Sequence, residues 1–159
     1  MNKKSSKTKQ ELLGYQTLRF QDLIREMVDC CEDRKLYESQ KFNLPYAELK
    51  CLVLFKGERY LTVKGIAERL EVAKSRVTKI VNGLNKKGLV EQIDDPKDGR
   101  IRLISLTPEG QKIAEEVESF QTELHRQILL KLSPEERRNV LSYLEMLRAA
   151  MEAVKEQFL

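Results

Sequence analysis

Apolar side chains recur at helical spacing along most of this chain, and one region departs from that pattern. The spacing predicts a long helix over about residues 9–40 and a second helix from Pro45 to about residue 55. Two more helices are predicted over about residues 108–131 and 134–158. The last one repeats its apolar positions at heptad-like intervals, as helices do that pack lengthwise against a partner. The pattern therefore predicts a mainly helical protein.

The departure from the helical pattern lies within residues 61–108. Two short helices are predicted over residues 62–70 and 74–87, each with its apolar positions on one face, and only three residues separate them. Two strands over residues 89–93 and 100–106 then form a hairpin with a charged, turn-rich tip. The residues whose hydroxyls mark helix starts are Thr62, Thr107 and Ser133. This region is predicted to be a winged helix-turn-helix.

These elements predict a mainly α fold with a small β-hairpin wing (α+β). We expect a disordered basic tail over residues 1–8 and N-terminal helices for dimerisation and support over 9–57. The winged helix-turn-helix occupies residues 58–110, and C-terminal dimerisation helices occupy 111–159. The terminal helices carry apolar stripes that the short domain between them cannot cover. Pairing with a second copy is the economical way to bury such stripes.

Positive charge gathers in one predicted helix. The whole chain has a formal net charge of +4, yet residues 74–87 hold five basic residues and no acidic one. A local positive face suits a polyanion, although an isolated charge run is about as often a solvated surface. A helix fits the major groove of B-DNA, where its N-terminal residues reach base edges. We therefore expect double-stranded DNA as the partner.

Candidate DNA-binding residues lie on this helix and at the hairpin tip. Arg76 is the candidate for a guanine edge, because a guanidinium matches the two acceptors of guanine. Arg100 at the tip suits the minor groove, and Asp98 is close enough in sequence to hold its guanidinium in one direction. The lysines expected at phosphates are Lys79, Lys86 and Lys87. The full DNA-binding set is Lys74, Ser75, Arg76, Thr78, Lys79, Asn82, Lys97, Asp98 and Arg100.

The region 61–110 also contains motifs that characterise one protein family. They are Leu61–Leu70, Ser75–Leu84, Lys87–Val90, the wing Asp95–Arg100 and the ending Leu106–Gly110. Together with the flanking helices they resemble the MarR family of bacterial transcriptional regulators, and the wing Asp-x-Arg followed by Leu-Thr-x-x-Gly is the most specific part. The resemblance implies a homodimer with its two winged domains on successive turns of a pseudo-palindromic operator. It also implies that Arg100 is the minor-groove arginine and that Ser75–Lys79 reads the major groove.

The same resemblance implies a repressor that a small effector releases. Members of the family respond to aromatic acids, other phenolic compounds or oxidants, and the ligand sits between the dimer helices and the winged domain. The candidate lining residues are Tyr15, Arg19, Phe20, Tyr37 and Tyr46. Aromatic residues at helical spacing are more often core residues. The alternative is a thiol switch at Cys30, Cys31 or Cys51, although free cysteines are also common as small buried apolar residues.

The sequence does not favour an enzyme, and we expect no catalytic residue, metal or cofactor. The single histidine, His125, lacks the surrounding pattern of a metal site or a triad, and no glycine-rich phosphate loop is present. No apolar run approaches the roughly 20 residues of a membrane helix, so we expect no membrane partner. Three unpatterned cysteines favour the reducing cytoplasm. A winged domain used only for protein contact remains the other alternative, and it would leave Lys79 and Arg100 dispensable.

The apolar stripes of the terminal helices predict a symmetric dimer at micromolar concentration. Analytical ultracentrifugation of the purified chain should give about twice the monomer mass of 18.5 kDa. A species that sediments as a monomer at that concentration would contradict the prediction.

Overall fold

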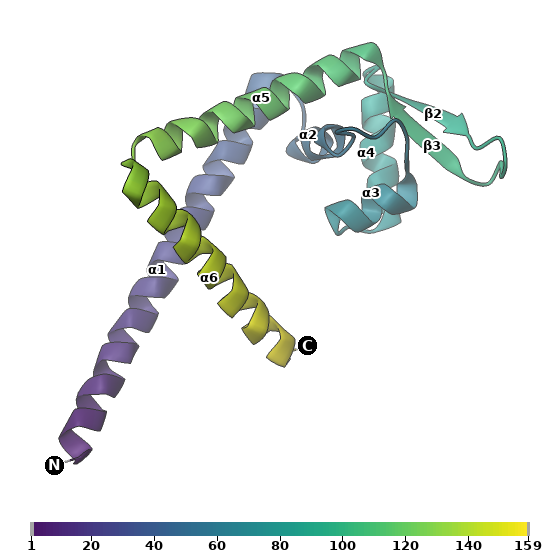
Figure 1. Cartoon of the computed structure of the whole chain (residues 1–159). Coiled ribbons are helices and arrows are strands. Elements are labelled where there is room, and N and C mark those ends of the chain that lie inside the picture. Colours follow the sequence, from purple (N-terminus) through teal and green to yellow (C-terminus); the bar gives the residue numbers. More distant parts are fainter. Residues whose placement is uncertain (1, 159) are drawn as a thin grey trace. The chain divides into compact units, whose positions relative to one another are not determined.

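A computed structural model describes residues 2–158, with side chains described from residue 8 onward. The elements, shown in Figure 1, are α1 (Asn2–Phe42), α2 (Tyr46–Val53), β1 (Leu61–Thr62), α3 (Val63–Leu70), α4 (Lys74–Lys86), β2 (Val90–Asp94), β3 (Arg102–Leu106), α5 (Pro108–Leu130) and α6 (Pro134–Phe158). The chain forms two compact units, residues 1–114 and 115–159, and α5 runs through the boundary. The predicted fold class, mainly α with a small β wing, is confirmed.

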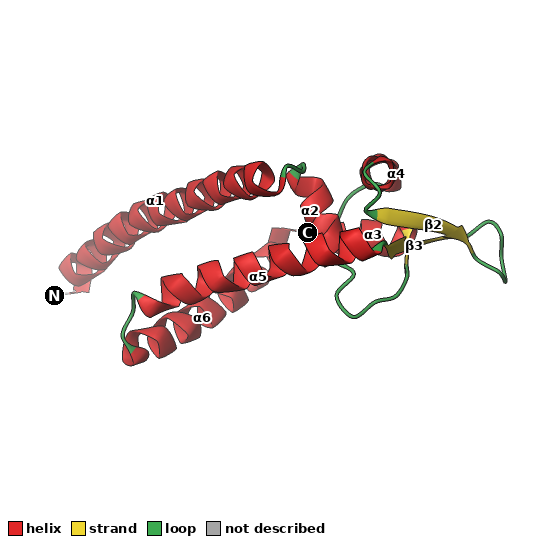
Figure 2. Cartoon of the chain, turned by 90° about the horizontal axis from the view of Figure 1, so that it is seen from above, coloured by secondary structure: helices red, strands yellow, loops and turns green. Residues whose placement is uncertain are grey.

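The sheet has three antiparallel strands in the order β1-β3-β2. The hairpin register runs from Val90 opposite Leu106 to Asp94 opposite Arg102, and this hairpin is the yellow pair of strands in Figure 2. Strand β1 pairs with β3 through Leu61 opposite Ile104. The sequence did not predict β1, because a two-residue strand is too short to show alternation.

The first helix begins earlier than predicted. It starts at Asn2, whereas the sequence predicted a disordered tail over residues 1–8, of which Met1 lies outside the described residues. The segment contains no proline or glycine, and lysine, its commonest residue, is a good helix former. A polar composition is therefore compatible with a helix. A smaller difference is that Pro45 is the N-cap of α2 instead of its first helical residue.

The helix-turn-helix forms as predicted, and local contacts and backbone conformations mark the ends of its two helices. The N–H of Gly65 donates to Thr62 Oγ1 at 3.0 Å, which caps α3. The chain leaves α3 through Glu71, whose φ of 54° is left-handed. Gly88 (φ 70°) follows α4 in the left-handed conformation that glycine commonly adopts just after a helix.

The apolar stripe of α4 is part of the core of the first unit. Its four members are buried against α2, α3 and the sheet, so the opposite side of α4 faces solvent. The buried members are Val77, Ile80, Val81 and Leu84. The orientation of α4 therefore follows from its hydrophobic pattern.

In the second unit, Ser133 marks the start of α6 as predicted, and it forms a capping box there with Glu136. The N–H of Ser133 donates to Glu136 Oε2 at 2.7 Å, and the N–H of Glu136 donates to Ser133 Oγ at 3.3 Å. The first of these bonds lowers the pKa of the Glu136 carboxyl. Along α6 no residue is buried, and Leu144 and Met151 of its apolar stripe are about half exposed. No helix within residues 2–158 is long and apolar enough to cross a membrane.

A close backbone contact at Gly110 joins the first turn of α5 to the end of the α4–β2 connection. The N–H of Gly110 donates to Thr107 Oγ1 at 3.0 Å, and that hydroxyl donates to the Gly88 carbonyl at 2.7 Å. The N–H of Thr107 donates to the Leu89 carbonyl at 3.1 Å. A Cβ at Gly110 would lie 1.9 Å from that same Leu89 oxygen. Only glycine fits at this position without movement of the backbone.

Gly110→Ala should therefore destabilise the fold by overpacking. Such strain typically costs about 1–3 kcal/mol, which for a chain of this size is a fall in Tm of roughly 2–12 °C. Thermal unfolding followed by circular dichroism measures it. Gly99→Ala is the control, because nothing lies within 4 Å of a Cβ at Gly99. Equal Tm values for the two variants would contradict the proposed clash.

Candidate nucleic-acid interface

The exposed side of α4 carries all the polar residues that the sequence assigned to DNA there. The side chains on this face are Lys74, Ser75, Arg76, Thr78, Lys79 and Asn82, and each is exposed. The Thr78 hydroxyl donates to the Lys74 carbonyl at 3.0 Å, so its own helix orients it. The N-cap, Ala73, makes no side-chain bond to the first turn. The free N–H groups of that turn and the helix dipole therefore add a positive potential at the N-terminal end of α4.

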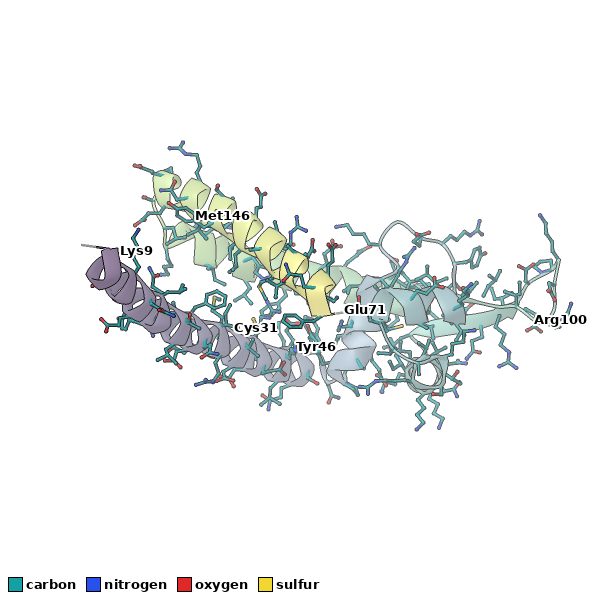
Figure 3. The ribbon with its side chains drawn as sticks, turned by 90° about the horizontal axis from the view of Figure 1, so that it is seen from below. Lys9, Cys31, Tyr46, Glu71, Arg100 and Met146 are labelled. Carbon is teal, nitrogen blue, oxygen red and sulfur yellow. The ribbon has the colours of Figure 1, made fainter. Side chains whose placement is uncertain are left out.

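The wing ends in an arginine whose direction is set by a neighbouring carboxylate. Both the backbone N–H and Nε of Arg100 donate to Asp98 Oδ1, at 3.0 and 3.2 Å. The side chain of Arg100 is nevertheless 93% exposed, and Figure 3 shows Arg100 at the far end of the wing. The predicted role of Asp98 in holding the guanidinium is confirmed. The N–H of Lys97 donates to Asp95 Oδ1 at 2.7 Å, which stabilises the turn that carries them.

A shallow hollow of about 360 Å³ connects α4 to the wing. It is lined by four cationic side chains and by no acidic one among the residues that form it. Its members are Thr62, Val63, Lys64, Lys74, Arg100, Ile101 and Arg102. Lys64 and Arg102 were not predicted from the sequence, because neither belongs to a charge run. The pairing of β1 with β3 brings them together, with Thr62 opposite Leu103.

The sequence predicted that Lys87 contacts a DNA phosphate, whereas in the structure its ammonium pairs with a carboxylate of the protein. Its Nζ lies 2.9 and 2.7 Å from the two carboxylate oxygens of Glu48 on α2. Glu48 is 7% exposed, so the partly exposed Lys87 neutralises a buried carboxylate of the protein. Lys86, the next residue back, is exposed. No local pattern could have revealed a contact between residues 39 positions apart.

The predicted effector residues do not come together in the first unit. Tyr46 alone lines a cavity of about 540 Å³ between α1, α2, α3 and α4, while the other four lie on α1 outside it with exposed side chains. Those four are Tyr15, Arg19, Phe20 and Tyr37. The cavity also presents the cations Lys35, Lys50 and Arg76 and the apolar side chain of Leu70. The ammonium of Lys35 lies 5.7 Å from the centre of the Tyr46 ring and also pairs with Glu32.

The three cysteines occupy two different environments. Cys30 and Cys31 are exposed on α1, and Cys51 on α2 is fully buried. Burial, with a smaller contribution from the charge of Glu48, raises the pKa of the Cys51 thiol to about 12. A protonated, inaccessible thiol is unreactive. Across residues 2–158 no three His, Cys, Asp or Glu side chains form a group that could hold a metal ion.

Comparisons with known proteins agree on one family. A family model described as MarR family matches residues 42–101. The chain is 31% identical over 121 residues to the uncharacterised HTH-type transcriptional regulator YfiV of Bacillus subtilis (strain 168), covering 76% of this chain and 75% of YfiV. It is 33% identical over 117 residues to the HTH-type transcriptional repressor MdtR of the same organism, with coverage of 74% and 70%. The crystal structure of YusO from Bacillus subtilis is similar with a TM-score of 0.69 and 29% identity, covering 89% of this chain and 97% of YusO.

The buried position of Cys51 predicts that it resists alkylation in the folded protein. At pH 8 a thiol with a pKa of about 12 is almost entirely protonated, so only unfolding or a pH near 12 should expose its thiolate. Iodoacetamide treatment followed by peptide mass spectrometry measures this, with the same chain in urea as the control. Rapid labelling of Cys51 at pH 8 without urea would contradict the prediction.

Proposed function

This chain belongs to the MarR family of transcriptional regulators, and we propose that it is a homodimeric repressor that binds a pseudo-palindromic operator and is released by a small effector. It is a DNA-binding regulator and not an enzyme. The observation that supports the proposal best is the cationic, exposed side of α4 next to the oriented Arg100 of the wing. A repressor of this kind acts in the cytoplasm, where the DNA lies.

In the proposed complex, each part of the interface has a separate role. Helix α4 enters the major groove, with Arg76 at a guanine edge and Lys79 at a phosphate. The wing places Arg100 in the adjacent minor groove, where a narrow A·T-rich segment concentrates negative potential. The hollow between them takes a backbone phosphate, because Lys64, Lys74 and Arg102 line it.

A dimer supplies the second reading helix. Residues 9–57 and 111–159 are the proposed dimerisation segments, and the half-exposed apolar stripe of α6 supports this role. A two-fold dimer would set two copies of α4 about 34–36 Å apart, which is one turn of B-DNA. The operator is then an inverted repeat whose half-sites have that spacing.

The cavity beside Tyr46 is the proposed effector site. Lys50 and Arg76 provide partners for a carboxylate, and the ring of Tyr46 with Leu70 provides an apolar surface for an aromatic ring. An aromatic acid fits this combination. Arg76 belongs both to this cavity and to the reading side of α4, so an effector that holds its guanidinium withdraws it from DNA. For the alternative thiol switch, Cys30 and Cys31 remain as candidate reactive cysteines, because Cys51 is buried.

Two substitutions on α4 should weaken DNA binding in different ways. Arg76→Ala should cost about 1–3 kcal/mol on the operator and relax the base preference at one position. Lys79→Ala should weaken all sequences similarly and lower the slope of log K against log salt by about one unit. Fluorescence anisotropy over a salt series measures both, on an operator found by genomic footprinting of the purified protein.

The same anisotropy assay tests whether the chain is a DNA-binding repressor that an effector releases. Aromatic acids added to the complex should release the operator. If the wild-type chain shows no salt-sensitive association with any promoter fragment, including its own, the proposed function is wrong. If Lys79→Ala and Arg100→Ala both bind DNA as wild type does, the winged domain serves protein contact instead.

A further inference from the structure

A carboxylate lies buried between α2 and the reading helix α4, which are neighbours in Figure 1. Glu48 of α2 is 7% exposed, and Lys87, at the end of α4, holds both of its oxygens at 2.9 and 2.7 Å. Buried carboxylates are costly unless they are paired and hydrogen-bonded. An apolar residue would fill the same interface without that cost. The position therefore calls for an explanation other than stability.

A glycine in α4 leaves space for this carboxylate. Gly83 lies in the interior of α4, where glycine is the least favourable residue apart from proline. A Cβ at Gly83 would lie 2.4 Å from Glu48 Oε1, so the carboxylate occupies the space that a side chain would take. Gly83 and Lys87 stand four residues apart, which puts them on one face of the helix. Glu48 thus meets α4 at two points along the helix axis.

We propose that Glu48 is a positioning residue that sets the rotation and axial position of α4, and with them the alignment of Arg76 to the bases. This inference rests on the proposed DNA-reading role of α4. Successive residues of a helix differ by 100° in direction, so a small rotation of α4 moves Arg76 off a guanine edge. The groove between α2 and α4 that Glu48 lines also contains Ser75, Arg76 and Lys79, so the contact acts close to the reading residues.

A positioning role predicts a different result from an electrostatic or a purely structural role. Glu48→Gln keeps the shape of the side chain and removes one negative charge, which by itself strengthens binding to any DNA. Loss of alignment weakens binding to the operator alone, because non-specific binding depends on charge and not on base contacts. Loss of fold stability lowers Tm and weakens binding to both kinds of DNA.

The first experiment compares two variants with the same change of net charge. Glu48→Gln should lower operator affinity by about 5-fold or more, since a bidentate arginine–guanine contact contributes at least that discrimination. Its affinity for non-specific DNA should stay equal or rise. The matched control is Glu58→Gln, which breaks the surface pair between Glu58, in the loop after α2, and Arg69 of α3 (2.7 Å). The control should leave the ratio of operator to non-specific affinity unchanged.

The second experiment is a double-mutant cycle, and it tests whether the Glu48 carboxylate needs the free space beside Gly83. Gly83→Ala should weaken operator binding, because its Cβ displaces the carboxylate of Glu48. In a Glu48→Ala background the same Gly83→Ala change should cause no further loss of operator affinity and should raise Tm, since alanine favours a helix. Thermal unfolding of every variant separates a loss of alignment from a loss of fold.

Two results would overturn the inference. One is a Glu48→Gln variant that keeps the wild-type ratio of operator to non-specific affinity. The other is a Gly83→Ala change with the same effect on operator affinity in both backgrounds. Failure of the proposed function itself is distinguishable, because the wild-type chain would then show no preference for any operator.

Discussion

Burial of the apolar stripe of α4 is the constraint on which the rest of this structure depends. Four aliphatic side chains of that helix are buried against its neighbours, and they fix which side of the helix remains in water. Removal of such side chains from water stabilises the packing by roughly 1.5–3 kcal/mol each. The polar side chains of α4 are exposed as a direct result. The same few residues thus stabilise the fold and orient the surface that we propose binds DNA.

The elements that depend on local physics were predictable from the sequence. Helical periodicity, the hydroxyl cap of Thr62 and the left-handed Gly88 are signals within a few residues, and the structure has each of them. The carboxylate of Asp98 lies only two residues from the guanidinium that it binds. The helical start at Asn2 was not predictable in this way, because a short polar, lysine-rich segment is also typical of a disordered tail.

The contacts that join distant parts of the chain were not predictable in the same way. Strand β1 is too short for a pattern, and its pairing with β3 is what places Lys64 and Arg102 beside the wing. The Glu48–Lys87 pair spans 39 positions. The proposed effector cavity contains Tyr46 and not the other four candidate residues, because the only part of α1 that lines it is its last turns. Charge runs and periodicity describe single elements, and these features depend on the packing between elements.

The contact between Gly110 and the Leu89 carbonyl has a consequence for how this domain can vary. A single residue inserted or deleted between Leu106 and Gly110 would bring a side chain against that carbonyl and move the capping hydroxyl of Thr107 away from Gly88. The contact therefore constrains the length of this corner. The wing tip has no comparable restraint at Gly99. Changes in loop length should be tolerated at the tip, where they alter the reach of the wing without disturbing its attachment.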